Sequence, residues 1–332
     1  LVVSPGSRSQ ALALVAAELE SSGLIQLHVR IDERVAGFTA LGIGRETGTP
    51  AVVVCTSGTA VANLLPAALE AHHAGVPLLL LTADRPPELR GVGANQTTRQ
   101  PGLFRPAVRF EADLAVPDTT DVDGSGEQTA AFDAVAGEAL AASLGEGMRA
   151  AGPVHVNVPF REPLAGAVPG WLTERAASRA VESTPDPSED TSGALYQGGG
   201  GIGIADVAPD PEAAHRIETG PRTIVVAGAD AGPAAEQFAH AGGFPLVAEI
   251  VSGARFGRQI VHGYRALLRE PALGGRIERV VLFGRPTLSR EVAVLLGRDD
   301  VEVLALRGPG EPVNLNGATV AVDAVRVTGE AD

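Results

Sequence analysis

Cysteine and aromatic side chains are scarce in this sequence of 332 residues, and lysine is absent. The single cysteine, Cys55, excludes a disulfide framework and a metal site built from several cysteines. Because it ends an apolar run, we expect a reduced thiol in the core. Aromatic residues make up only 4% of the chain, so the cores must consist mainly of alanine, valine and leucine. No signal peptide and no apolar run of about 18–20 residues is present, so we expect a cytoplasmic protein without a membrane span.

An excess of positive charge is also missing, since the net charge is -14 at pH 7. A chain this acidic is unsuited to general binding of nucleic acid or of an anionic membrane surface. It can still hold a local group of arginines that binds an acidic metabolite. The length suggests two or three domains.

The pattern of apolar segments predicts an α/β protein with two parallel-sheet αβα domains. Short apolar strands alternate with helices of about 12–16 residues, which is typical of parallel sheets covered on both faces. We predict a first domain over 1–164, a linker rich in proline, glycine, serine and acidic residues over 165–222, and a second domain over 223–332. The expected strands are 1–4, 25–31, 51–55, 76–82, 154–158, 223–227, 245–249, 279–283, 301–306 and 318–322. The expected helices are 10–21, 32–45 with Asp32 as its cap, 58–73, 130–149, 233–241 and 290–296.

Polar residues follow several of these strands, at the sheet edge where parallel α/β proteins bind ligands. Arg8 lies in a turn that opens a helix, and it either binds an anion or belongs to an ordinary helix start. Glu33 is either a cleft carboxylate or a first-turn carboxylate favoured by the helix dipole. Gly58 permits close approach of the backbone to a ligand. The polar loop with Arg85 and Gln96 follows a core strand, where loops of this length are usually functional.

Other motifs carry less weight. The turn at Cys55–Thr59 lacks the glycine of a nucleophile elbow and the Gly-Lys-Ser/Thr of a Walker loop. The seven histidines show no metal spacing. Gly228–Gly232 lacks the dinucleotide pattern, and Gly198–Gly201 favours a flexible tether. Arg290 either faces a cleft or begins a solvated helix.

Seven segments stand out when they are taken in order: SPGSRS at 4–9, DER at 32–34, TSGTAVAN at 56–63, LLTADRPPEL at 80–89, GANQTTRQPGLF at 93–104, GPVHVNVPFREPL at 152–164 and FGRPTLSR at 283–290. The first six resemble one enzyme family, and the seventh resembles the central domain of its actinobacterial members. The family is the 2-succinyl-5-enolpyruvyl-6-hydroxy-3-cyclohexene-1-carboxylate synthases of menaquinone biosynthesis, which depend on thiamine diphosphate; we call them the menaquinone-pathway synthases. The combination of ADRPPEL and GANQ is specific to it.

The resemblance implies a pyrimidine-binding domain over 1–164 and a central domain over 223–332. It also implies that a C-terminal diphosphate-binding domain is absent from this sequence, because no Gly-Asp-Gly motif is found. These enzymes decarboxylate 2-oxoglutarate on thiamine diphosphate and add the succinyl carbanion to isochorismate. The metal, Mg²⁺ or Mn²⁺, is held by the third domain, so no metal ligand is expected here. A fragment without that domain is expected to be inactive.

The resemblance also assigns roles to individual residues. Glu33 is the expected catalytic residue, which contacts the cofactor's aminopyrimidine, and Thr59 and Asn63 are expected beside the cofactor. The family implies a homodimer or homotetramer. Two alternatives remain open: another thiamine enzyme, such as an acetohydroxyacid synthase or a decarboxylase, and a non-catalytic binding module. The expected substrate-binding residues are Ser7, Arg8, Arg85, Gln96 and Arg290.

Overall fold

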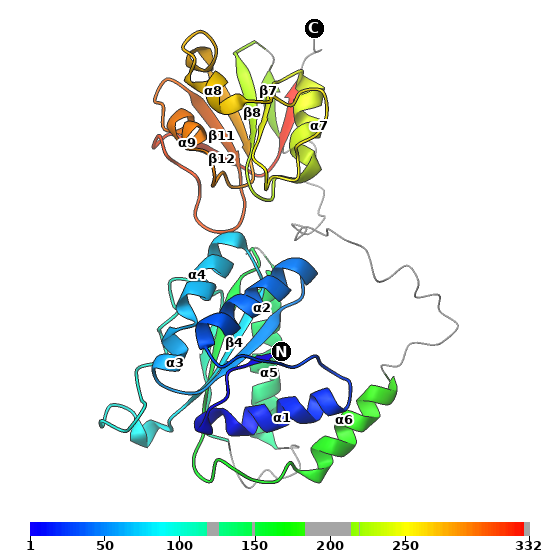
Figure 1. Cartoon of the computed structure of the whole chain (residues 1–332), viewed down its shortest axis with the longest axis vertical. Coiled ribbons are helices and arrows are strands. Elements are labelled where there is room, and N and C mark those ends of the chain that lie inside the picture. The colour runs from blue at the N-terminus through cyan, green and yellow to red at the C-terminus, as the bar shows by residue number, and fades with distance from the viewer. Residues whose placement is uncertain (118–125, 148–149, 183–213, 219, 329–332) are drawn as a thin grey trace. The chain divides into compact units, whose positions relative to one another are not determined.

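The computed structural model describes residues 1–117, 126–147, 150–182, 214–218 and 220–328. The chain divides into two compact units, residues 1–202 (unit 1) and 203–332 (unit 2) (Figure 1). Each unit is built around a parallel sheet with helices on both faces, so the predicted α/β fold class is confirmed.

Unit 1 contains a six-stranded sheet in the order β2-β1-β3-β4-β6-β5, and all its strand pairs are parallel. Parallel strands end at the same edge, so the segments after β1, β3, β4 and β6 all emerge there. This edge is where the predicted site residues follow their strands. The strands are Val2–Val3 (β1), His28–Val29 (β2), Ala51–Cys55 (β3), Leu78–Asp84 (β4), Glu111–Asp113 (β5) and Pro153–Pro159 (β6).

The helices of unit 1 cover the two faces of this sheet. Helices α2 and α4 bury alanines against one face, and α1 and α5 pack on the other. Cys55 is a free, fully buried thiol in the first of these cores, as predicted. Burial raises its pKa well above the ordinary value. The helices are Gln10–Ser21 (α1), Glu33–Thr47 (α2), Thr59–Ala62 (α3), Leu65–Ala74 (α4), Glu127–Leu144 (α5) and Gly170–Glu182 (α6), with 3-10 turns at Ser7–Ser9 (η1) and Pro87–Leu89 (η2).

The single helix predicted over 58–73 is wrong, because the structure divides it into α3 and α4. Pro66 lies in the first turn of α4, where its missing N–H costs no hydrogen bond. The chain turns at Asn63 and Leu64 and then restarts as a helix. This break places Asn63 at the end of α3, where it faces the start of α2.

The segment predicted as a linker, 165–222, lies largely outside the described residues, since 183–213 are among those not described. At its start the chain forms α6, which packs against α1. Near its end His215–Glu218 (β7) pairs in parallel with Val325–Thr328 (β13). The domain limits at 164 and 223 therefore stay a prediction.

Unit 2 contains a five-stranded parallel sheet in the order β12-β11-β10-β8-β9. One face packs against α7 and the other against α8 and α9. The predicted strands and helices of this unit are present, and β7, α8 and β13 were not predicted. The elements are Thr223–Ala227 (β8), Gly232–Gly242 (α7), Leu246–Ala248 (β9), Tyr264–Arg269 (α8), Gly274–Arg276 (η4), Arg279–Phe283 (β10), Arg290–Leu296 (α9), Glu302–Leu306 (β11) and Val320–Val322 (β12).

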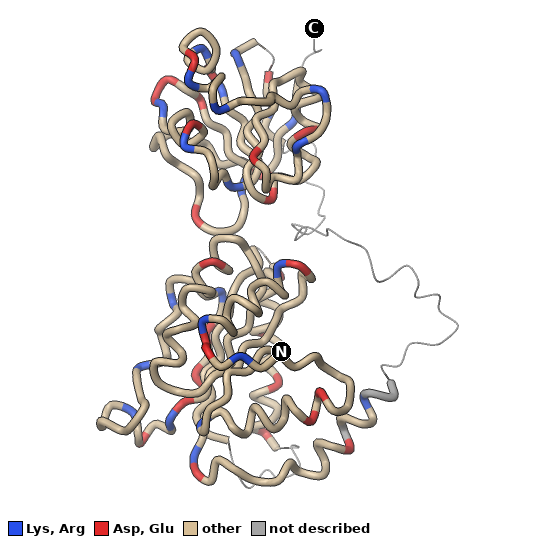
Figure 2. Tube along the Cα trace, in the orientation of Figure 1, with Lys and Arg blue, Asp and Glu red and all other residues tan. Residues whose placement is uncertain are grey.

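Charged residues of both signs are interspersed along the described parts of both units (Figure 2). No helix in the described part of the chain combines the length and the apolar character that a membrane crossing needs.

Candidate active site

The turn after β3 and the loop after β4 meet at the carboxyl edge of the unit 1 sheet. Ser57 Oγ donates to the Gln96 carbonyl oxygen at 3.0 Å, and Gln96 Nε2 donates back to the Ser57 carbonyl oxygen at 3.2 Å. Arg85 Nη1 donates to Ser57 Oγ at 3.2 Å, and its Nη2 donates to the Asn95 carbonyl oxygen at 2.7 Å. The structure therefore brings Arg85 and Gln96 together, as their positions after one strand predicted.

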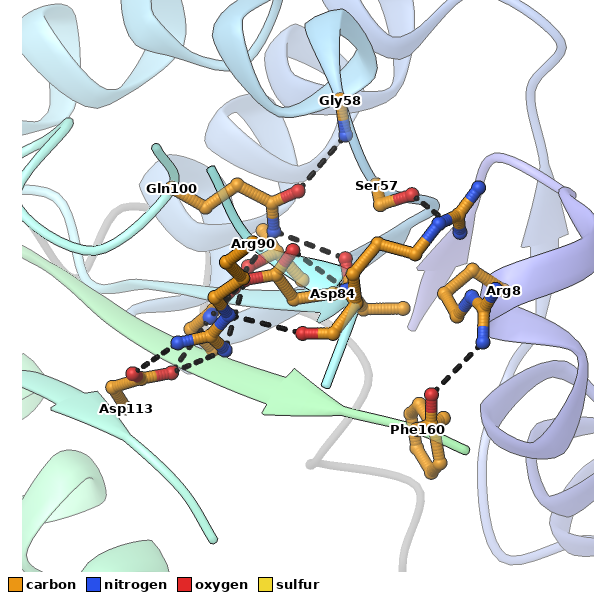
Figure 3. A network of polar contacts seen from close by, with 12 residues as sticks. Arg8, Ser57, Gly58, Asp84, Arg90, Gln100, Asp113 and Phe160 are labelled. Carbon is orange, nitrogen blue, oxygen red and sulfur yellow. Dashed lines mark hydrogen bonds and ion pairs between the residues drawn. The ribbon is translucent and has the colours of Figure 1, made fainter. Parts of the chain in front are cut away.

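Gly58 has a φ of +85°, which favours glycine. A Cβ atom at this position would lie 2.9 Å from Cγ and from the carbonyl oxygen of Gln96. The Gly58 N–H donates to Gln100 Oε1 at 2.8 Å (Figure 3). The close approach that the sequence suggested at Gly58 is thus made to the protein's own loop.

Arg8 lies in η1, after β1, and only 6% of it is exposed. Its Nη1 donates to the Phe160 carbonyl oxygen at 2.9 Å (Figure 3), and its Nη2 lies 3.8 Å from Glu162 Oε1. Its Nε is buried, and no described residue makes a hydrogen bond to it. Burial and then the positive charge of Arg85 lower the pKa of Arg8. An anion beside this guanidinium would satisfy its unpaired donor and reduce the repulsion between the two arginines.

A buried polar network supports the loop that carries Arg85 (Figure 3). Asn157 lies at its centre: its Nδ2 donates to Asp84 Oδ2 at 2.9 Å and to Asp113 Oδ1 at 2.8 Å. Its Oδ1 accepts from Gln100 Nε2 at 2.8 Å and from Thr82 Oγ1 at 2.9 Å. We call Thr82, Asp84, Arg90, Gln100, Asp113, His155 and Asn157 the polar network.

Charges in the polar network are paired. Arg90 contacts buried Asp84 at 2.9 Å and Asp113 at 2.6 Å, and its Nε donates to the Arg85 carbonyl oxygen at 3.0 Å. Burial raises the pKa of Asp84, against the hydrogen bonds from Asn157 and the Arg85 amide. At Asp113 burial acts in the same direction, but hydrogen bonds from Arg90 and Asn157 outweigh it and the pKa is lowered. The network therefore fixes both ends of the loop after β4.

The sequence-based prediction did not include the network residues Gln100 and Asn157. A usable signal was present, because Thr82, Asp84, His155 and Asn157 are polar residues inside otherwise apolar buried strands. Buried polar groups need partners, so such residues indicate a network at the place where their strands pair. The pairing of β4 with β6, which sets Thr82 opposite Asn157, is not visible from local sequence.

Glu33 is the first residue of α2, which Asp32 caps by accepting hydrogen bonds from the amides of Arg34 and Val35. The cap was predicted. Glu33 is partly buried, and its Oε2 accepts a 3.3 Å hydrogen bond from Asn63 Nδ2. Thr59 is exposed at the start of α3. The structure thus joins two of the three residues that were expected beside the cofactor.

Ser7 is exposed in η1, next to Arg8. Arg290 belongs to unit 2, where it is exposed at the first position of α9. There it lines a surface pocket of about 570 Å³, together with residues 285–289 and 311–315. The described residues contain no group of three or more His, Cys, Asp or Glu side chains that could hold a metal ion.

The loop before Arg290 is held by one carboxylate. Glu249 is fully buried, and its oxygens accept hydrogen bonds from the amides of Thr287 at 2.8 Å, Leu288 at 3.1 Å and Ser289 at 2.8 Å. Ser289 Oγ also lies 2.7 Å from the hydroxyl of Tyr264. These contacts fix the start of α9, although nothing in the sequence singled out Glu249.

Comparison with known proteins decides the family resemblance. Residues 2–103 match the family model described as "Thiamine pyrophosphate enzyme, N-terminal TPP binding domain". The whole chain is 52% identical to a protein of Leifsonia xyli subsp. xyli named 2-succinyl-5-enolpyruvyl-6-hydroxy-3-cyclohexene-1-carboxylate synthase. The chain is homologous to the menaquinone-pathway synthases. A synthase of the same name from Clavibacter michiganensis subsp. michiganensis is 49% identical over 99% of this chain, and one from Arthrobacter sp. is 48% identical over 91%.

The chain spans about half the length of the curated relatives it matches: 52% of the first two and 46% of the third. The resemblance drawn from the seven sequence segments is therefore confirmed, and the domain match over residues 2–103 agrees with it. The other thiamine enzymes considered above, which lack the ADRPPEL and GANQ combination, are not favoured by these relatives.

Proposed function

We propose that the whole protein to which this chain belongs is a menaquinone-pathway synthase. It decarboxylates 2-oxoglutarate and joins the remaining succinyl unit to isochorismate, and it uses thiamine diphosphate as cofactor. The observation that carries the proposal is the pair of guanidiniums of Arg8 and Arg85 at one sheet edge, in a chain 52% identical to a named synthase. In this proposal residues 1–164 form the pyrimidine-binding domain and residues 223–332 the central domain.

Both proposed substrates carry two carboxylates, so an acidic protein needs local positive charge to bind them. Arg8 is buried with an unpaired Nε, and Arg85 presents its guanidinium from the neighbouring loop. Charge-assisted hydrogen bonds from such arginines are stronger than neutral ones. Gln96 adds a side-chain amide beside them. We assign these residues, with Ser7, to the isochorismate side of the site. We also propose Arg290 of unit 2 as a substrate-binding residue.

Glu33 is the proposed catalytic residue. Thiamine diphosphate, when bound, supplies the electron sink for the decarboxylation. The carboxyl group fits the aminopyrimidine ring, because it is partly buried and Asn63 holds only one of its oxygens among the described residues. With the cofactor bound, Glu33 would share a proton with a ring nitrogen, which is general acid–base chemistry at a positioned carboxyl group. Thr59 and Asn63 lie at the same turn and complete this side of the site.

The proposed function also includes a metal ion and an oligomeric state. A diphosphate needs a divalent cation, for which we propose Mg²⁺ or Mn²⁺, and we assign it no ligand among the described residues. We also propose a homodimer or homotetramer. The apolar side chains of Val35 and Phe38 in α2 and of Ile31 just before this helix are exposed, and such apolar surface supports association.

Steady-state kinetics of the whole protein with isochorismate varied tests the substrate assignment. Arg8→Ala and Arg85→Ala should each lower kcat/KM roughly 10- to 150-fold, since each removes a charge-assisted contact worth about 1.5–3 kcal/mol. Binding of thiamine diphosphate should change much less. Arg105→Ala is the matched control, because Arg105 is exposed and pairs only with Glu111 among the described residues. Unchanged kinetics in both variants would contradict the assignment.

The role of Glu33 needs a separate test. Glu33→Gln should lower kcat by about 10²-fold or more, because it removes a positioned proton-transfer group. Calorimetry should show that the variant still binds the cofactor. Turnover close to that of the wild type would remove Glu33 from its catalytic role and leave the arginine assignment intact.

A further inference from the structure

Ser57 contacts two of the proposed substrate-binding residues at once. It lies in the turn between β3 and α3 and is fully buried. Its hydroxyl accepts a hydrogen bond from Arg85 Nη1 at 3.2 Å and donates to the Gln96 carbonyl oxygen at 3.0 Å. Its own carbonyl oxygen accepts from Gln96 Nε2 at 3.2 Å. No other described residue makes side-chain hydrogen bonds to both Arg85 and Gln96.

The backbone around these contacts leaves little freedom. Gln96 has a φ of +51°, in the left-handed region that residues other than glycine rarely adopt. It packs so closely on Gly58 that an added Cβ atom there would lie 2.9 Å from Gln96. The hydrogen bond from Ser57 Oγ to the Gln96 carbonyl therefore helps to hold an unfavourable conformation. Without it, Gln96 can relax toward an ordinary backbone geometry.

The polar network secures the Ser57 turn from the other side. The Gly58 amide donates to Gln100, whose Nε2 binds Asn157 and the Ala83 carbonyl oxygen. The turn is therefore anchored to the sheet, and Ser57 transmits that fixed position to Arg85 and Gln96. Arg85 has four rotatable side-chain bonds, and its guanidinium would otherwise lose conformational entropy on binding a carboxylate.

We propose that Ser57 is a positioning residue for isochorismate recognition, which orders the Arg85 guanidinium and the Gln96 side chain before the substrate binds. The proposal rests on the proposed function for the identity of the substrate. We assign Ser57 no contact with substrate or cofactor. Its hydroxyl acts only through the two residues that it holds.

The kinetic test compares Ser57→Ala with Ser143→Ala in the whole protein. Ser143 is a matched control, because it is also fully buried and its hydroxyl also makes two hydrogen bonds, with the Leu78 amide and the Gly152 carbonyl oxygen. It lies in the last turn of α5, where its hydroxyl contacts the start of β4, at the sheet edge opposite to the site. Ser57→Ala should raise the KM for isochorismate roughly 5- to 15-fold and leave kcat within about twofold. Ser143→Ala should leave both constants unchanged.

A second measurement does not depend on turnover. In ¹⁵N-labelled protein, the Arg85 Nε–H and Gln96 Nε2–H₂ signals should broaden or move toward solvent values in Ser57→Ala. Ser57→Thr, which keeps the hydroxyl, should restore them and the KM. If Ser57→Ala leaves these signals and the KM unchanged, the proposal is wrong, whatever happens to thermal stability. If the wild type does not use isochorismate, the proposed function fails, and unchanged signals still overturn the positioning role.

Discussion

The two units differ in the contacts that hold a loop at the carboxyl edge of the sheet. In each, a loop that follows a parallel strand must be held rigid at the carboxyl edge of the sheet. Unit 1 uses the polar network, in which neutral amides and paired charges from several strands share hydrogen bonds. Unit 2 uses Glu249, whose single carboxylate binds three consecutive backbone amides.

The difference has a consequence for each site. A distributed network fixes several side chains relative to one another, and it also holds the backbone at Arg85 and, through Gln100, the turn at Gly58. A carboxylate that binds only backbone fixes the path of the chain and leaves the side chain of Arg290 exposed. Unit 1 thus presents an ordered set of donors, whereas unit 2 presents one arginine on a fixed helix start.

The largest effect is expected from breaking the polar network. Asn157→Leu removes four hydrogen bonds and leaves Asp84 and Asp113 each without one of their donors. The free energy of unfolding of unit 1 should fall by about 3–4 kcal/mol, because each buried polar group left unsatisfied costs about 1–3 kcal/mol and most partners keep another contact. Scanning calorimetry should show a lower melting temperature for unit 1 and an unchanged transition for unit 2.

Asn63→Ala is the control for this substitution, because Asn63 is exposed and makes one hydrogen bond to Glu33. It should leave the melting temperature nearly unchanged. A small effect of Asn157→Leu would mean that the network is not what stabilises the loop after β4, and the contrast between the two units would lose its basis.

Replacing the single carboxylate of Glu249 should lower the stability of unit 2 by somewhat less. Glu249→Gln keeps the shape but turns an acceptor into an NH₂ group that faces backbone N–H donors. We expect a loss of about 2–3 kcal/mol in the stability of unit 2. Hydrogen exchange should become faster at the amides of residues 287–289. Glu302→Gln, at a half-exposed residue paired with Arg279, should leave that exchange unchanged; equal acceleration in both variants would contradict the role of Glu249.

Local sequence was sufficient for much of the fold. Residues 10–21 and 290–296 are helices within the predicted limits, and 51–55 is a strand, because apolar periodicity reflects burial directly. Asp32 was predicted as a cap from its position before a helical pattern. The edge that collects Arg8 and Arg85 follows from parallel topology alone.

The missing parts depend on contacts between distant residues. Gln100 and Asn157 are 57 positions apart, and they come within hydrogen-bond distance because β4 pairs with β6 and the loop after β4 folds back onto these strands. The positive φ of Gln96 is set by its packing on Gly58, and local propensity gives no sign of it. Helix α6 lies where the composition favoured a linker, and its packing against α1 outweighs that composition.

Acid should weaken the polar network of unit 1 before it affects the exposed ion pairs. Burial lowers the pKa of His155, despite its contact with Glu111. Below about pH 6.5 the unfolded chain takes up a proton that the folded chain does not, so stability falls as the pH falls. His155 can change the free energy of unfolding by at most about 1.4 kcal/mol per pH unit. Urea denaturation between about pH 7.5 and 5.5 should show this slope in the wild type and lose it in His155→Gln; an unchanged slope would exclude His155 as its source.

The smallest effect is expected from an ion pair outside the network. Arg161 and Glu88 are both more than half exposed and lie 2.6 Å apart. The hydrogen bond from Arg161 lowers the pKa of Glu88 to about 2. A carboxyl group whose pKa is lowered by folding stabilises the folded state at pH values above its pKa in the unfolded chain, and this stabilisation is lost as the pH falls. For an exposed pair the stabilisation is small, because solvent screens the charges. Arg161→Gln should therefore return the Glu88 pKa toward about 4.3 in a ¹³C NMR titration and leave the melting temperature unchanged at neutral pH. If it lowered that temperature as much as Asn157→Leu does, the stability of unit 1 would come from its surface charges, and the network would not distinguish it from unit 2.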